Sequence, residues 1–100
     1  MTVTLATRFV VVDAKAALRD SKTAKEIWMK AGAKAFRARQ FYTGVFNNEW
    51  LFHIEFKDLA HFQKCRDMVN QSKENAALQV SVAKAGSKLV GRELLFELDV

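Results

Sequence analysis

The sequence predicts an α+β domain with a four-stranded antiparallel sheet and helices on one of its faces. Three observations lead to this fold class. Several segments alternate apolar and polar residues as half-buried strands do, longer segments repeat apolar residues three or four positions apart as helices do, and Asp or Gly stands where these helices would begin or end. The segments follow in the order strand, helix, strand, strand, helix, strand, and we expect residues 1–100 to form a single domain.

The first strand and the first helix are expected on either side of Asp13. Thr4 to Val12 is rich in β-branched residues, which favour strands. Asp13 is suited to cap a helix because its carboxylate accepts hydrogen bonds from backbone N–H groups, and Gly32 is a natural end for that helix. Small and apolar residues recur three or four positions apart, as on one side of a helix: Ala14, Ala17, Leu18, Ser21, Ala24, Trp28 and Ala31. The step from Asp20 to Ser21 is the place where this helix would break.

A hairpin is expected in the middle of the chain. Lys34 to Thr43 and Glu49 to Phe56 alternate as strands do, and GVFNN at residues 44–48 supplies the Gly and Asn that tight reversals need. On the second strand of this hairpin one face consists of Trp50, Phe52, Ile54 and Phe56, and the other of Leu51, His53 and Glu55.

The second half of the chain completes the pattern. Asp58 is expected to cap a second helix, whose apolar side consists of Leu59, Phe62, Cys65 and Val69. A short helix from Glu74 to Ala85 and a strand from Leu89 to Leu98 follow. This order is the split βαβ, or ferredoxin-like, arrangement, in which right-handed crossovers place the helices on one face of the sheet. The other face then stays open in the monomer.

Glu55 indicates which face of the sheet the helices cover, because the opposite register would bury its carboxylate. We expect one core between helices and sheet, formed by Phe9, Trp28, Phe52, Ile54, Phe62 and Phe96, with Tyr42 and Trp50 on the same side. The open face combines Val10, Val12, Phe41, Leu51 and Leu95 with Arg8, Arg37, Arg39, His53, Glu55, Glu93 and Glu97. So many large apolar side chains on an exposed face usually indicate an interface or a ligand groove. We therefore predict a homodimer.

Composition narrows the classes of partner. Sixteen basic and eleven acidic residues give a formal charge of +5, but the basic residues are scattered and form no nucleic-acid-binding motif. The longest apolar runs, such as Phe9 to Val12, are too short to span a bilayer, and the N-terminus lacks the pattern of a signal peptide. The single cysteine, Cys65, fits a reducing compartment. We therefore predict a cytoplasmic protein with neither a membrane nor a nucleic acid as its main partner.

Three segments are similar to a known group of proteins: RFVVVDAKAA at residues 8–17, AFRARQFYTGVFNNEWLFHIEFKDLAHF at residues 35–62, and GRELLFEL at residues 91–98. In EFKDLAHF a strand ends in an aromatic residue, and Asp-Leu then begins a helix with an aromatic residue three positions on. With these features the chain resembles the dimeric α/β-barrel superfamily, which includes NIPSNAP-like proteins, antibiotic-biosynthesis monooxygenases, EthD-like proteins and stress-responsive barrel domains.

The resemblance implies a dimer in which two sheets pack open face to open face around a pocket. Some members of the superfamily oxidise aromatic polyketides without a cofactor, some degrade haem, and many have no known activity. The Asn, Trp and His set of the haem-degrading members has no residue-by-residue match here. No cofactor is therefore predicted for this chain.

His53 is the candidate catalytic residue, because a neutral imidazole can exchange a proton near pH 7. The candidate ligand-binding residues around it are Arg37, Arg39, Phe41, Leu51 and Glu55. Two guanidinium groups suit an anionic oxygen, and the apolar residues suit the body of a ligand. The alternative is that His53 and Glu55 belong to a network of charges with the arginines at an interface.

Cys65 and His61 are not expected to be reactive. Cys65 lies on the apolar side of its helix and is interpreted as a small buried residue, and His61 lies on the first turn and is expected to be exposed. His53, His61, Glu55 and Cys65 do not have a zinc-site spacing, and no metal is predicted.

Three functions remain open from the sequence. The first is a small-molecule-binding dimer, with cofactor-free oxygenation or isomerisation of an apolar or aromatic substrate as its candidate activity. The second is a non-enzymatic module whose open face serves only dimerisation. The third is a basic protein that binds nucleic acid.

Overall fold

The computed structural model describes residues 1–100, which form four strands and three helices. In chain order they are β1 (Val3–Val10), α1 (Ala14–Ala31), β2 (Ala35–Gln40), β3 (Trp50–Phe56), α2 (Leu59–Gln71), α3 (Lys73–Lys84) and β4 (Lys88–Phe96). The predicted order of elements is confirmed. Strands β1, β3 and β4 are each one residue shorter than predicted, whereas β2 has 6 residues because it ends at Gln40 and not at Thr43.

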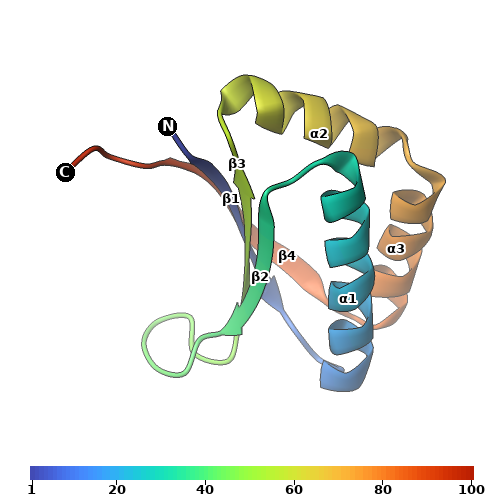
Figure 1. Ribbon diagram of the computed structural model, residues 1–100. Helices are drawn as coiled ribbons and strands as arrows, with labels where there is room; N and C mark the ends of the chain where they lie inside the picture. Colours follow the sequence, from blue (N-terminus) through green and yellow to red (C-terminus); the bar gives the residue numbers. More distant parts are fainter.

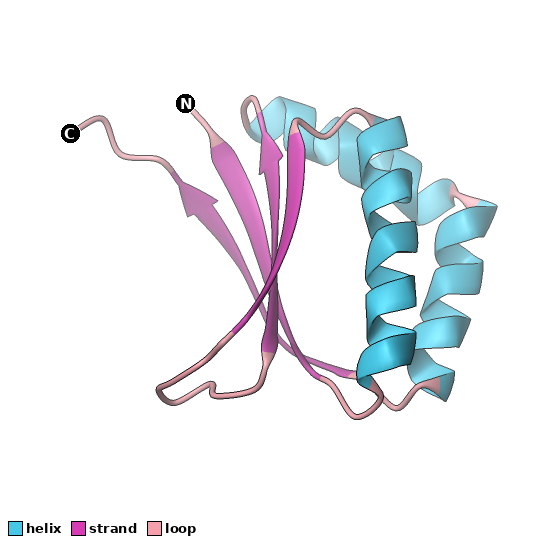
Figure 2. Cartoon of the chain, turned by 60° about the horizontal axis from the view of Figure 1, so that its bottom comes forward, coloured by secondary structure: helices cyan, strands magenta, loops and turns pink.

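The strands form one antiparallel sheet in the order β2-β3-β1-β4. All three helices lie on the same face of this sheet, and the other face is uncovered (Figure 2). In Figure 1, α1 and α3 run side by side while α2 crosses one end of the molecule. The ferredoxin-like fold class is therefore confirmed, with α3 as an additional helix beside α1.

Local signals in the sequence set the ends of the helices. The Asp13 carboxylate accepts a hydrogen bond from the Ala16 N–H at 3.0 Å, and the Asp58 carboxylate accepts one from the His61 N–H at 2.8 Å. Gly32 ends α1 with a φ of 110°, a left-handed conformation that favours glycine. Helix α1 continues through Asp20 without a break.

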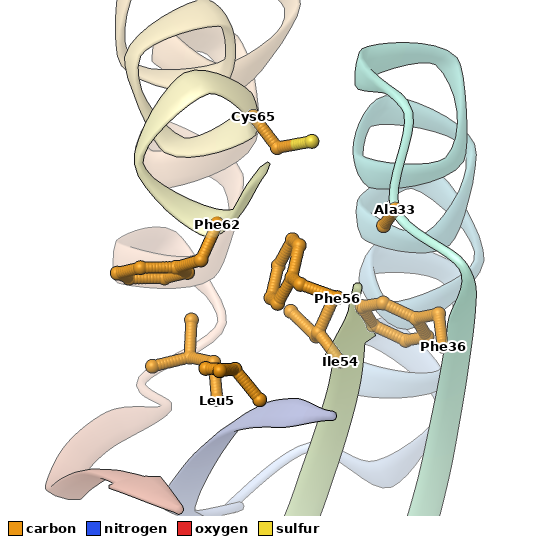
Figure 3. Packing of buried hydrophobic residues seen from close by; sticks show 8 residues of the cluster. Leu5, Ala33, Phe36, Ile54, Phe56, Phe62 and Cys65 are labelled. Atoms are coloured by element: carbon orange, nitrogen blue, oxygen red, sulfur yellow. The ribbon is translucent and has the colours of Figure 1, made fainter. Parts of the chain in front are cut away.

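The best-packed part of the core lies where α2 crosses the sheet (Figure 3). Val3 and Phe56 pair across β1 and β3 and are completely buried, and Cys65 of α2 is 1% exposed. The ring of Phe56 packs edge-on against Phe62 at a centroid distance of 5.1 Å. These contacts confirm that the face of β3 containing Ile54 and Phe56 is the one that the helices cover.

Two expectations about the core are wrong. Phe96 is 47% exposed, because it lies at the end of an edge strand that runs away from the helices (Figure 1). Tyr42 is 91% exposed, because β2 ends at Gln40 and the chain has already entered the hairpin loop. Within this loop Gly44 and Asn48 adopt positive φ angles, as the predicted reversal requires.

Candidate functional site

The residues predicted as a site on the open face come together there as ion pairs and hydrogen bonds. Arg37 lies directly opposite His53 across β2 and β3. The Arg37 guanidinium contacts the Glu55 carboxylate at 2.5 Å, and Nη1 of Arg39 lies 3.1 Å from Nδ1 of His53. Arg8 adds a second group of contacts, with Glu49 at 3.2 Å and Glu93 at 3.3 Å. The charges of this face therefore largely compensate one another, although Glu97 forms no ion pair.

His53 is held as a hydrogen-bond acceptor within this network. Burial of the imidazole, and then the positive charge of Arg39, lower the pKa of His53 from its ordinary value, and Glu55 opposes part of the shift. Because a guanidinium can only donate, Nδ1 of His53 accepts from Arg39. Leu51 shares this face, whereas Phe41 lies beyond the end of β2 and packs against Phe46 at a ring distance of 5.5 Å. The catalytic role of His53 stays a prediction.

A cavity lies on the other side of the sheet, between the sheet and the helices, and most of its helical wall comes from α1 and α3. It has a volume of about 310 Å³, and 12 of its 20 lining residues are hydrophobic, so it is predominantly an apolar space. The sheet contributes Leu5, Thr7, Phe9, Phe36, Phe52 and Ile54 to its wall. Phe9 and Phe52 pack edge to face at a ring distance of 5.6 Å.

Small side chains on α1 leave room for this cavity. Ala17, Ser21 and Ala24 are spaced four and three positions apart and line it from the helix side, so no large side chain of α1 enters the space between them. Trp28 follows at the same helical spacing, also lines the cavity, and packs against Phe56 at a ring distance of 5.7 Å. The cavity is therefore continuous with the packed core at the Trp28 end.

Polar groups also line the cavity. Asp20 is 7% exposed, and its Oδ1 accepts a hydrogen bond from the Ser81 hydroxyl of α3 at 2.7 Å. Its other oxygen, Oδ2, is buried without any protein partner, and so is the Ser87 hydroxyl. Arg92 of β4 lines the same cavity. The space therefore combines aromatic walls with a few fixed polar groups, as ligand sites commonly do.

Comparisons with known proteins bear on the fold. No family model matches the chain, and no curated protein sequence is significantly similar to it. Among solved structures, SnoaB, a cofactor-independent oxygenase from Streptomyces nogalater, gives a TM-score of 0.65 with 15% sequence identity over 99% of this chain and 95% of its own. An uncharacterized NIPSNAP domain protein from Burkholderia xenovorans gives 0.70 with 14% identity, covering 100% of this chain and 95% of its own.

A dimeric ferredoxin-like protein of unknown function from Thermobifida fusca gives a TM-score of 0.63 with 12% identity, over 98% of this chain and 92% of its own. The chain shares the ferredoxin-like fold of these proteins. The predicted resemblance is thereby confirmed at the level of the fold. Because the sequence identities are 15% or lower, the likeness establishes the fold, and the chemistry of the cavity depends on this chain's own residues.

Asp20 and the cavity are not predicted from the sequence. The sequence predicts a weak point of the helix at the Asp20–Ser21 step, whereas both residues are buried in a continuous helix. The available signal was a polar pair beside a row of small residues on the inward side of an amphipathic helix. Such a row indicates that the helix cannot fill the space in front of it.

His61 and Cys65 have structural positions. His61 is half-buried rather than exposed: its Nδ1 accepts from the Lys57 N–H at 2.9 Å, so the proton on Nε2 donates to the Gly32 carbonyl at 2.8 Å. Cys65 is a free, buried thiol as predicted, and burial raises its pKa. No three His, Cys, Asp or Glu side chains come together as a metal site. None of the three helices has the length and apolar character needed to cross a bilayer.

Proposed function

We propose that this protein binds a small, largely apolar or aromatic molecule in the cavity between the sheet and helices α1 and α3. The observation that supports this proposal most strongly is the cavity itself. Its volume of about 310 Å³ is at the lower end of the range for ligand pockets, roughly 300–1,000 Å³. A one- or two-ring compound is the size of ligand that such a space would accept.

The aromatic side chains give a reason for binding. Phe9, Trp28 and Phe52 are only partly buried although they lie on the helix-covered side of the sheet. A ligand that covers them removes apolar surface from water, which is worth about 25 cal/mol per Å². Edge-to-face contacts with the rings would favour an aromatic ligand further.

Cofactor-free oxygenation or isomerisation of the bound molecule is the enzymatic form of this proposal. The likeness in fold to SnoaB, a cofactor-independent oxygenase, supports it. Oxygen consumption in the presence of bound aromatic compounds tests the oxygenase form. His53 lies on the opposite face of the sheet from the cavity, so its predicted catalytic role requires a substrate on the open face instead. If no compound binds, the function that remains is assembly through the open face.

We propose in addition that the open face mediates a homodimer in the cytoplasm. Val10 and Leu95 are each at least 40% exposed on this face, and similar structures from Thermobifida fusca and Bacteroides fragilis are described as dimeric. The single free cysteine supports a reducing compartment.

Leu51→Lys should weaken the dimer at least about tenfold, since it places a charge in an apolar contact. Light scattering checks this result, with Leu18→Lys on the exposed side of α1 as the control.

The cavity is tested by filling it. Ala24→Leu adds three carbon atoms to a lining position of α1, and it should weaken the binding of 1-naphthol at least about tenfold, by steric exclusion. Ala77→Leu makes the same change at an exposed position of α3 outside the cavity and should leave the affinity unchanged. Calorimetric titration measures both affinities. Equal binding by the two variants would contradict the proposed site.

A further inference from the structure

We propose that Oδ2 of Asp20 is the group that orients the ligand, by accepting a hydrogen bond from a hydroxyl on an otherwise apolar molecule. This inference rests on the proposed function, because it assigns a specificity-determining residue to the same cavity. It adds a selection rule: a ligand with a hydroxyl at the right place binds more tightly than an isostere without one.

The two oxygens of Asp20 differ in their surroundings. Oδ1 accepts from the Ser81 hydroxyl at 2.7 Å, a contact that joins α1 to α3, and Nε of Arg19 lies 3.9 Å from the same atom. Oδ2 is buried and has no protein partner, although the side chain is only 9% exposed. A buried carboxylate oxygen without a hydrogen bond is costly, so a donor that enters the cavity gains a favourable position.

The charges around the cavity favour a neutral donor over a cationic one. Arg92 lines the same cavity and has no ion-pair partner, so its positive charge offsets part of the attraction that Asp20 exerts on an ammonium ligand. Arg19 also compensates part of the Asp20 charge from the Oδ1 side. A hydroxyl donates a charge-assisted hydrogen bond to Oδ2 without bringing a second positive charge into the cavity.

The Ser87 hydroxyl provides a second, independent indication of a polar ligand group. It lies between α3 and β4, lines the cavity, and is buried without a partner. A hydroxyl can both donate and accept. Two unpartnered polar atoms from separate segments therefore border one largely apolar space, which is the arrangement expected where a mostly apolar molecule has a few polar substituents.

Two probes of similar size separate the hydroxyl effect from the apolar effect. The probes are 1-naphthol and 1-methylnaphthalene, which differ by a hydroxyl in place of a methyl group. Calorimetric titration gives the ratio of their dissociation constants for the wild-type protein, for Asp20→Leu, which replaces the carboxylate by an apolar group with the same branching, and for Asp20→Asn. Asp67→Asn is the control, because it removes a carboxylate that is 64% exposed on α2, outside the cavity. Thermal unfolding checks that each variant folds.

The expected result is that the wild-type protein and Asp67→Asn prefer 1-naphthol, and that this preference falls at least about tenfold in Asp20→Leu, the usual effect of losing a hydrogen bond to a charged group. Asp20→Asn should show an intermediate preference, since the amide oxygen still accepts. If both probes bind and the preference is absent or survives in Asp20→Leu, the role of Asp20 is overturned while the cavity remains a binding site. If neither probe binds the wild-type protein, the proposed function fails together with this inference.

Discussion

The two ends of the space between helices and sheet differ in how completely side chains fill it. At the α2 end, Val3 and Phe56 are fully buried and Cys65 is 1% exposed. At the other end, Phe9 and Phe52 line a cavity of about 310 Å³ and stay partly exposed. The same sheet face, with the same alternation of residues, is thus solid at one end and hollow at the other.

The difference comes from the helices. Helix α2 places Phe62 and Cys65 against the sheet, whereas α1 faces it with Ala17 and Ser21 over the cavity. The hollow end also contains Asp20, a buried carboxylate with an unpartnered oxygen, while the packed end contains no buried charge. Stability is therefore concentrated at one end, and the capacity for selective binding at the other.

The largest expected difference between the two ends is the loss of stability when an aromatic residue is truncated to alanine. Phe56→Ala should lower the free energy of unfolding by about 3–5 kcal/mol, because it empties a fully buried site. Phe9→Ala should cost roughly half as much or less, since its ring already borders a cavity. Chemical denaturation measures both values. Equal losses would contradict the difference in packing.

Enlargement of alanines gives the converse comparison. Ala33→Leu at the packed end should destabilise the protein by about 1–3 kcal/mol, because Ala33 is 6% exposed within the core and the added carbons have no room. Ala24→Leu should leave the stability unchanged or raise it by up to about 1 kcal/mol, as cavity-filling substitutions commonly do. Thermal unfolding of the two variants measures the contrast, and a larger loss for Ala24→Leu would show that the cavity does not accept the side chain.

The smallest expected effect is the pH dependence of stability that His53 contributes. His53 lies on the open face and belongs to neither end of the space between helices and sheet. The pKa of His53 is lowered from its ordinary value of 6.5, so the unfolded chain takes up the proton more readily than the folded one. Stability from this residue is therefore fully present above pH 6.5 and is lost as the pH falls through 6.5 to the folded value. His53→Gln should remove that part of the pH dependence while matching the wild-type slope at pH 8. If the stability of His53→Gln falls below pH 6.5 as steeply as that of the wild-type protein, the pH dependence belongs to another group.

The fold could be predicted from the sequence because its signals are local. Asp13, Gly32 and Asp58 cap helices through their own immediate neighbours, and the alternation from Trp50 to Phe56 defines the covered face. The grouping of charged residues around His53 on the open face could be predicted for the same reason. Residues of matching parity on paired strands must be adjacent, and Arg37 lies opposite His53.

The cavity could not be predicted in this way. Its existence depends on the sizes of side chains that meet across two layers, such as Ala24 of α1 facing the sheet, and on where α3 lies beside α1. The unpartnered oxygen of Asp20 depends on a contact with Ser81, which is 61 residues away in the chain. Phe96 has the correct parity for the core, and only the direction of the strand end leaves it exposed.

The most direct test of the account is to locate a bound ligand at one end of the molecule. Titration with 1-naphthol, followed by the methyl resonances of the alanines in an NMR spectrum, distinguishes Ala17 and Ala24 at the cavity from Ala33 in the packed core. The account predicts saturable shifts at Ala17 and Ala24, with Ala33 nearly unchanged. Shifts confined to Ala6 and Ala35, which pair with His53 and Glu55 on the open face, would contradict it.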